Sequence, residues 1–244
     1  MKTLLVIFLM LTIPAAAAYA DVCVQQKSHT DGYYYGGVTT PPEDEETEMW
    51  IGADRMAVIS ENTSVIVNSA AKQMIFVNHR DSTYAEIAMP MDWSQVVDEA
   101  LLGRLAMFKR QGEIEATGET KKIGKWECKG YKVITWIPYM DMKYDERETT
   151  MWVATNAPID MAVYGEMNVE LGKLRNFSDE LIEQNKKIDG IPIASDGVIY
   201  QKGFSVDTNE ELIKMFEDDA PAEVYAVPEG YTKKDQLTIQ DLRS

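Results

Sequence analysis

The sequence predicts an α+β fold, in which helices pack against one antiparallel sheet. Three observations lead to this prediction: short segments of alternating apolar and polar residues fill the first half of the chain, one amphipathic helical segment follows, and longer strand-like segments then resume. Only a few residues separate the short segments, too few for the crossover helix that a parallel pair needs. We therefore expect neighbouring strands to be antiparallel and to form a meander.

The first half of the chain supplies the short strands. Polar or turn residues such as Asp54, Glu61-Asn62 and Arg80-Asp81 separate them. A charged segment with two prolines, 39–46, interrupts the series and is expected to be a hairpin loop, not a domain boundary. The predicted strands are 22–29, 49–52, 55–60, 64–68, 73–79 and 83–89.

The strongest helix prediction covers 93–108. Its apolar residues recur at i, i+3, i+4, i+7 and i+8, so they share one face of the helix. Asp92 is the expected N-cap, Gln95 completes a capping-box pattern, and Gly112 follows the helix. The apolar face consists of Trp93, Val96, Val97, Ala100, Leu101, Leu105 and Phe108.

The second half of the chain is expected to contain both strands and helices. Asp160 can cap one helix that runs to Leu174, and Ser178 can cap another that ends before Gly190. The segment 209–217 is compatible with a strand or a helix, and the polar tail from residue 228 is expected to be loose. The predicted strands are 113–121, 126–137, 148–155, 191–204 and 212–217.

The N-terminus has the three parts of a secretory signal peptide. Lys2 gives it a positive start, 4–11 is an unbroken apolar run, and Ala18-Tyr19-Ala20 has the small residues expected before a cleavage site. The apolar run is too short to favour a retained membrane span, and no later segment resembles one. We expect a signal peptide at 1–20, cleaved after Ala20, and a single exported domain at 21–244, in the periplasm or secreted.

Two cysteines remain after this cleavage, Cys23 and Cys128. An oxidising compartment favours a disulfide between them, which closes a loop of about 100 residues and stabilises by about 4 to 5 kcal/mol in the chain-entropy model. Two buried free thiols are the alternative. Lipidation of Cys23 is disfavoured, because the residue directly before it is Val22, where a lipoprotein has a small residue.

The chain is strongly acidic, with 40 acidic against 24 basic residues and a net charge of −16 at pH 7. Such a surface repels phosphate backbones and anionic lipid headgroups, which excludes most nucleic-acid binders. The acidic run 43–46 lacks the alternating spacing of a calcium loop, so no metal site is expected.

Recognisable catalytic motifs are missing from the sequence. Only His29 and His79 are available as imidazole bases, and neither has an evident partner. The sequence has no G-x-S-x-G, H-E-x-x-H, C-x-x-C or G-x-G-x-x-G motif. Carboxylate pairs such as Glu113 and Glu115 arise by chance in so acidic a chain. We therefore expect a protein that is not an enzyme and needs no cofactor.

Adaptable apolar side chains are abundant, with 14 methionines and five tryptophans. Methionine changes shape easily and therefore suits a cavity that accepts flexible apolar ligands. Ordinary core packing is the alternative for each such residue. The residues expected to line a cavity are Trp50, Met74, Phe76, Trp93, Val97, Leu101, Leu105, Trp136 and Trp152.

Several short motifs carry a resemblance to known families. They are Thr117 to Gly124, Trp126 to Tyr131, Trp152 to Thr155, Gly190-Ile191-Pro192 and Val227 to Tyr231, in this order. In these motifs the chain resembles an uncharacterised group of exported bacterial proteins thought to share the fold of the lipoprotein carrier and receptor proteins LolA and LolB. The resemblance implies an unclosed β-barrel, that is, a strongly curved antiparallel sheet with helices on its concave side.

The function that this resemblance implies is binding without catalysis. A hydrophobic or acylated ligand, such as a lipid or a lipoprotein-like molecule, is expected in a half-barrel cavity between the sheet and the 93–108 helix. Another envelope protein is a possible partner. The alternative is a periplasmic protein-interaction or envelope-stress module, which has a filled core and acts through its rim.

Overall fold

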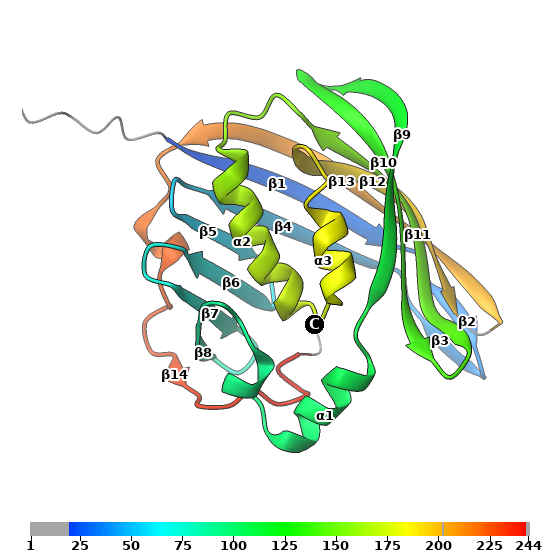
Figure 1. Ribbon diagram of the computed structural model, residues 1–244, viewed down its shortest axis with the longest axis horizontal. Helices are drawn as coiled ribbons and strands as arrows, with labels where there is room; N and C mark the ends of the chain where they lie inside the picture. Colours follow the sequence, from blue (N-terminus) through cyan, green and yellow to red (C-terminus); the bar gives the residue numbers. More distant parts are fainter. Residues whose placement is uncertain (1–19, 202, 243–244) are drawn as a thin grey trace, which may run out of the picture.

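The computed structural model describes residues 20–201 and 203–242, about half of which belong to one large sheet (Figure 1). Its 12 strands have the order β14-β8-β7-β6-β5-β4-β1-β13-β12-β11-β10-β9. Neighbours are antiparallel except β14 and β8, which are parallel. The edge strands β9 and β14 do not pair with each other within the described part of the chain, so the sheet is not closed.

The first half of the chain forms the predicted antiparallel meander from β4 to β8. The segment 39–46 was predicted to be a loop, and this prediction is wrong, because β4 begins at Glu43 and pairs with β1 as far as Thr30. Its acidic residues lie opposite Lys27 and His29, and both of these side chains contact the carboxylate of Asp44. The strands are β1 (Asp21–Thr30), β2 (Tyr33–Tyr35), β3 (Val38–Thr40), β4 (Glu43–Ile51), β5 (Arg55–Ile59), β6 (Thr63–Asn68), β7 (Gln73–Asn78) and β8 (Thr83–Ala88).

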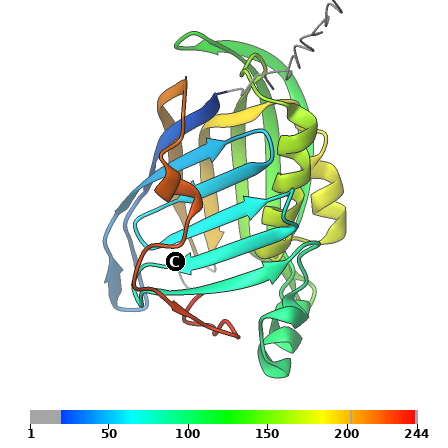
Figure 2. The same ribbon diagram turned by 90° about the vertical axis from the view of Figure 1, so that its left-hand side faces the viewer.

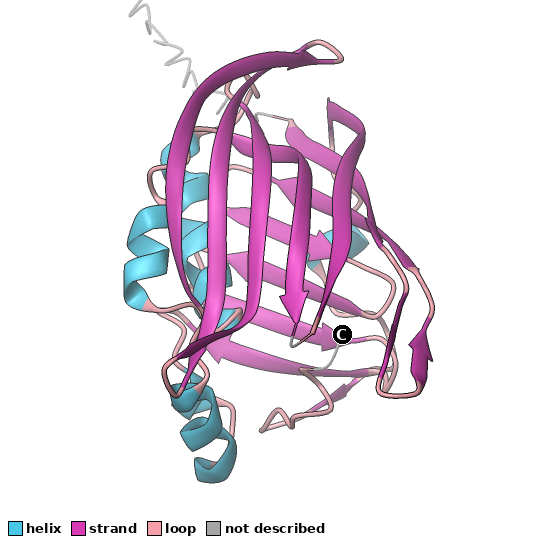
Figure 3. Ribbon diagram, turned by 90° about the vertical axis from the view of Figure 1, so that its right-hand side faces the viewer, coloured by secondary structure: helices cyan, strands magenta, loops and turns pink. Residues whose placement is uncertain are grey.

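The second half forms a wing of longer strands, and it joins the first half through the pairing of β13 with β1, in which Met215 lies opposite Val24. Figures 2 and 3 show the two wings from opposite sides. The segment 209–217 is part of a strand, β13, as one of the two interpretations predicted. The strands are β9 (Gln111–Ile123), β10 (Trp126–Tyr139), β11 (Met142–Ala154), β12 (Ile191–Gln201), β13 (Phe204–Asp218) and β14 (Thr232–Lys233).

The prediction of one continuous helix over 93–108 is wrong. The segment forms a 3₁₀ turn, η1 (Trp93–Gln95), and a separate helix, α1 (Glu99–Met107). The interruption occurs because Asp98 caps the second piece, where its side chain accepts a hydrogen bond from the backbone N–H of Leu101 at 2.7 Å. In Figure 1 α1 lies at the lower end of the molecule and does not lie across the sheet.

The helices that lie in front of the sheet in Figure 1 are α2 (Met161–Leu174) and α3 (Asp179–Asn185). Both begin at the predicted caps, since Asp160 accepts from the N–H of Ala162 at 2.9 Å and Ser178 from that of Leu181 at 3.2 Å. Apolar residues of α2 join the main core, and Leu181 of α3 packs with a smaller cluster on β9, β10 and β11. These two helices therefore cover the sheet where the 93–108 helix was expected.

The C-terminal segment is ordered against the sheet, so the prediction of a loose tail is wrong. It contains η2 (Ala222–Tyr225), and Figure 2 shows it crossing the outer face of the first wing. Leu237 is only 3% exposed and belongs to the main core. Asp241 is buried and accepts hydrogen bonds from Asn78 Nδ2 at 3.0 Å and Lys234 Nζ at 2.6 Å. These contacts outweigh the cost of ordering a polar tail.

The predicted disulfide is wrong, because both cysteines are free and buried. Cys23 lies on β1 and Cys128 on β10, and β13, β12 and β11 separate these strands in the sheet. Adjacent strands are about 4.8 Å apart, whereas the Cα atoms of a disulfide are about 4.4 to 6.8 Å apart. The alternative of two buried thiols is the one that the structure contains.

The predicted signal peptide at 1–20 lies outside the described residues, apart from Ala20. Within residues 20–201 and 203–242, none of the helices combines the length and apolar character needed to cross a membrane.

Candidate functional site

An open cavity of about 1320 Å³ lies between the sheet and the helices α2 and α3. Strands from both wings contribute to it, from β4 and β5 on one side to β9, β10 and β11 on the other. The space between sheet and helices is therefore only partly filled by side chains. Its size exceeds the roughly 300 to 1,000 Å³ that is usual for a small-molecule site.

Much of the cavity wall is apolar. Met49 of β4 and Val58 of β5 line one wing, Val133 of β10 and Met151 of β11 line the other, and Phe177 lies between α2 and α3. Two of these five side chains are methionines, which suits a lining that must adapt to a flexible ligand.

A belt of polar side chains interrupts the apolar wall. The belt runs across adjacent strands of the sheet, because Glu210 of β13 is directly opposite Ser195 of β12, and Gln26 of β1 is directly opposite Thr47 of β4. Its members are Gln26, Thr47, Thr135, Thr149, Ser195 and Glu210. Burial raises the pKa of the Glu210 carboxyl, which Arg175 opposes and Glu45 reinforces.

The lower end of α2 is fixed by a buried carboxylate. Glu170, 6% exposed, accepts a hydrogen bond from the backbone N–H of Met91 and pairs with Lys173 Nζ at 2.7 Å. Trp93 Nε1 donates to the carbonyl of Lys173 at 3.1 Å. Trp93 therefore has a structural contact with α2 and holds the cover of the cavity in place.

None of the nine residues predicted to line a cavity belongs to the lining of this one. Trp50 lies beside Phe216, with ring centroids 5.9 Å apart, and Lys121 and Lys143 lie over the rings of Trp152 and Trp136. Trp152 also belongs to the main core. The other six, of which all but the partly buried Leu105 are buried, belong to this core or pack against it: Met74, Phe76, Trp93, Val97, Leu101 and Leu105.

The prediction missed the lining by one residue at two places. Met49 and Met151 line the cavity, whereas their neighbours Trp50 and Trp152 do not. Successive side chains of a strand point to opposite faces, so on β4 the error of one position selects Trp50 on the face opposite to Met49. On β11 a register shift lies between Trp152 and Val153, and Trp152 packs into the main core. The methionine content was a usable signal, and preferring the larger tryptophan side chains was the mistake.

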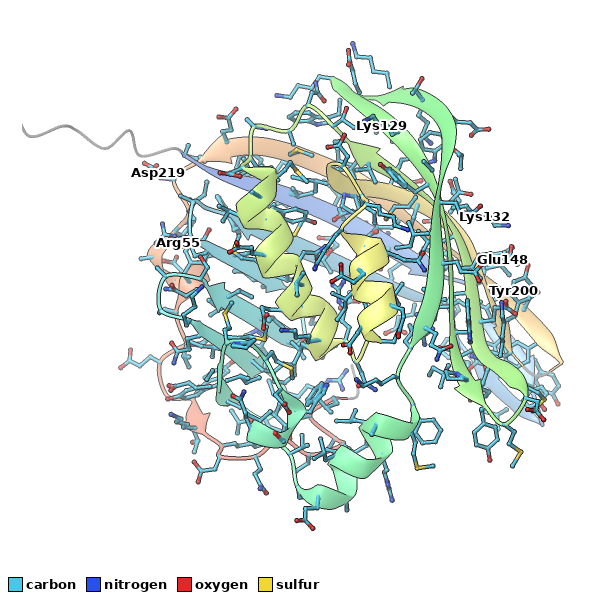
Figure 4. All side chains as sticks on the ribbon, viewed as in Figure 1. Arg55, Lys129, Lys132, Glu148, Tyr200 and Asp219 are labelled. Carbon is cyan, nitrogen blue, oxygen red and sulfur yellow. The ribbon has the colours of Figure 1, made fainter. Side chains whose placement is uncertain are left out.

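A second, smaller hollow of about 440 Å³ has a mostly polar lining that includes His29, Lys132, Glu148 and Tyr200. Figure 4 shows Lys132, Glu148 and Tyr200 at the edge of the second wing, away from α2 and α3. Lys132 Nζ and Glu148 are 3.6 Å apart. His29 lies between Asp44 and Asp31, whose hydrogen bonds raise the pKa of its exposed imidazole.

His79 has the partners that the sequence did not reveal. Its Nε2 lies 2.7 Å from Ser64 Oγ and its Nδ1 lies 3.0 Å from the Tyr231 hydroxyl. A serine–histidine contact is the geometry of nucleophilic catalysis, but Ser64 is only 6% exposed and lies outside both hollows. Burial lowers the pKa of His79. The three residues therefore fasten the C-terminal segment to the sheet.

Metal-binding chemistry has no support in the geometry of the described residues. Among them, no group of three or more histidine, cysteine, aspartate or glutamate side chains is arranged to hold a metal ion.

The sequence was also compared with known families. The model of a family described as "Domain of unknown function (DUF4412)" matches residues 39–231. The chain belongs to this family. The DUF4412 match begins within β3 and ends just before β14, so it includes α2, α3 and most of the strands that line the cavity. A family of unknown function agrees with the uncharacterised group that the sequence motifs resembled.

No curated protein matches this DUF4412 chain in sequence. Among solved structures, PNGF-II is similar over 91% of this chain and 32% of that chain, with 12% identity and a TM-score of 0.44. The chain therefore spans about a third of PNGF-II. A LolA superfamily protein, NE2245 from Nitrosomonas europaea, is similar over 85% of this chain and 90% of that chain, with 7% identity and a TM-score of 0.30. At TM-scores below 0.5 we draw nothing about function from either likeness.

Proposed function

We propose that this DUF4412 protein binds a hydrophobic or acylated ligand, without catalysing a reaction, in the cavity between the sheet and α2 and α3. The sheet then acts as an unclosed barrel, with α2 and α3 on its concave side. The observation that carries the proposal is the open volume of about 1320 Å³ with a largely apolar wall. As an exported protein, it would shield such a ligand from water while the ligand moves between membranes or between other envelope proteins.

The energetics favour an extended apolar ligand. Each methylene buried contributes about 0.8 kcal/mol, so ten methylenes contribute about 8 kcal/mol. Association costs several kcal/mol in lost freedom. The remainder corresponds to a reversible complex, which is what a carrier needs in order to release its ligand.

Native mass spectrometry and organic extraction of the purified protein test the proposal directly. We expect a copurified apolar molecule, or one-to-one binding of the uncharged fluorescent diarylamine 1-N-phenylnaphthylamine to protein stripped of ligand. A ligand-free spectrum together with no binding of this probe refutes it.

A protein-interaction module that acts through its rim is the second candidate. One observation favours it: large apolar side chains are exposed on the hairpin of β2 and β3 and at the turn between β10 and β11. Tyr34 of the hairpin is 69% exposed and Met140 of the turn is 82% exposed. Exposed side chains of this type are common at protein interfaces. Failure of both ligand measurements would leave this candidate.

A further inference from the structure

Two opposite charges line the cavity without pairing with each other. Glu210 projects from β13, and Arg175 stands at the C-terminal end of α2. Neither side chain forms a hydrogen bond or an ion pair with any other residue that the structure describes. They are nevertheless close enough for Arg175 to act electrostatically on Glu210. Of the charged residues that line the cavity and have no partner among the described residues, Glu210 is half-buried, whereas Arg175, Glu166 and Lys72 are exposed. Among these lining residues, Arg175 is the one that acts on Glu210.

The surroundings of Glu210 contain few other charges. The groups that act on it are Arg175, which directly follows α2, and Glu45 from β4. Its neighbours in the belt are uncharged, since Ser195 lies directly opposite on β12 and Gln26 uses its Nε2 to donate to the carbonyl of Pro192 at 3.4 Å. Within residues 20–201 and 203–242, no side chain or backbone N–H therefore donates a hydrogen bond to the Glu210 carboxyl, although it is half-buried.

Unsatisfied polar groups inside a cavity select for ligands that satisfy them. A fatty acid gives Arg175 an acceptor but brings a second negative charge to Glu210. A fatty amine gives Glu210 a donor but brings a positive charge to Arg175. A neutral group with both a donor and an acceptor meets both requirements.

We propose that the cavity selects an amphiphile whose polar group combines a hydrogen-bond donor for Glu210 with an acceptor for Arg175, as an amide does. Glu210 and Arg175 are then the specificity-determining residues of the site, and the alkyl part of the ligand lies along the apolar wall. This inference rests on the proposed function, because it names the chemical class of the ligand for the same cavity.

Three ligands with the same alkyl chain test this inference: dodecanamide, dodecanoic acid and dodecylamine. Their affinities are measured at pH 8 by displacement of 1-N-phenylnaphthylamine. At this pH the acid is anionic and the amine is cationic, and the pH lies above the ordinary pKa range of a glutamate carboxyl such as that of Glu210. We expect dodecanamide to bind about tenfold more tightly than either charged ligand.

Variants assign the preference to the two residues. Glu210→Gln is expected to tighten dodecanoic acid by about tenfold, and Arg175→Gln to tighten dodecylamine by a similar factor. Glu211→Gln is the matched control, because Glu211 is the next residue on β13, is exposed and does not line the cavity. It is expected to change none of the three affinities.

The outcomes separate this inference from the proposed function. Equal affinities for the three ligands, or variants that behave like Glu211→Gln, refute the selection by Glu210 and Arg175 but leave the carrier function standing. Failure of all three ligands and of the probe to bind refutes the carrier function itself.

Discussion

A large side chain introduced on α2 fills part of the cavity and so tests whether the cavity is the binding site. Gly165 lies in the middle of α2 and lines the cavity, and no described atom lies within 4 Å of the position that a Cβ atom would occupy there. Gly165→Trp therefore places an indole in open space without forcing the core apart. A helical glycine is also less stable than most residues by about 0.5 to 1 kcal/mol, so the variant is expected to fold at least as well as the parent.

The expected loss of affinity follows from the ligand surface that the indole displaces. An aromatic side chain occupies about 150 to 250 Å² of contact surface. If it displaces apolar ligand surface equivalent to three or four methylenes, at about 0.8 kcal/mol each, binding weakens by about 3 kcal/mol, or roughly 100-fold in Kd. Titration of 1-N-phenylnaphthylamine fluorescence measures this change.

Gly103→Trp is the matched control for this substitution. Gly103 is also a helical glycine with open space around it, but it lies on α1 and does not line the cavity. We expect Gly103→Trp to leave the Kd unchanged. If Gly165→Trp, with its melting temperature unchanged or raised, bound the probe as the parent does, the cavity under α2 would not be the binding site.

The remaining predictions concern stability and the thiols. The pKa of His79 is lowered by burial, so the folded state disfavours the imidazolium. The free energy of unfolding is therefore highest above pH 6.5 and falls as the pH drops from there through the pKa of the folded state. His79→Gln should remove this dependence, as measured by urea titrations at several pH values. For Asp241, burial raises the pKa, but the ion pair with Lys234 and hydrogen bonds outweigh it and lower the pKa to about 2. Its stabilisation is therefore present above pH 3.8 and lost as the pH falls toward 2, and Asp241→Asn should cost about 2 kcal/mol at pH 7 by chemical denaturation. Burial raises the pKa of the Cys23 thiol to about 12, so at pH 8 a thiol reagent should modify Cys23 and Cys128 only after denaturation; a mass two units below the reduced chain would instead reveal a disulfide.

Local patterns were sufficient where one segment decides its own structure. The caps Asp160 and Ser178 were predictable because a side chain near the start of a helix satisfies backbone N–H groups within the same turn. The 93–108 segment shows the limit of this approach. Its apolar periodicity continues through Asp98, yet a second cap at that residue divides the segment, and η1 turns Trp93 toward α2.

Which strand residues face the cavity was not predictable from alternation. A strand reveals its inner face when its other face is exposed to water. Here the outer face of the first wing is also covered: Val224, Tyr225 and Tyr231 of the C-terminal segment pack against Ala57 and neighbouring residues. With both faces apolar, the period-2 signal loses its phase, and the choice between Met49 and Trp50 could not be made.

The sequence by itself determined the antiparallel meander, the helix caps and the strongly acidic character, because each depends on residues close together in the chain. The tertiary structure alone decided that β13 pairs with β1, that three strands lie between Cys23 and Cys128, and that Glu210 and Arg175 face one cavity. These relations join residues that are far apart in sequence. They arise only when the two wings and the helices pack together, and no local pattern records which distant surfaces will meet.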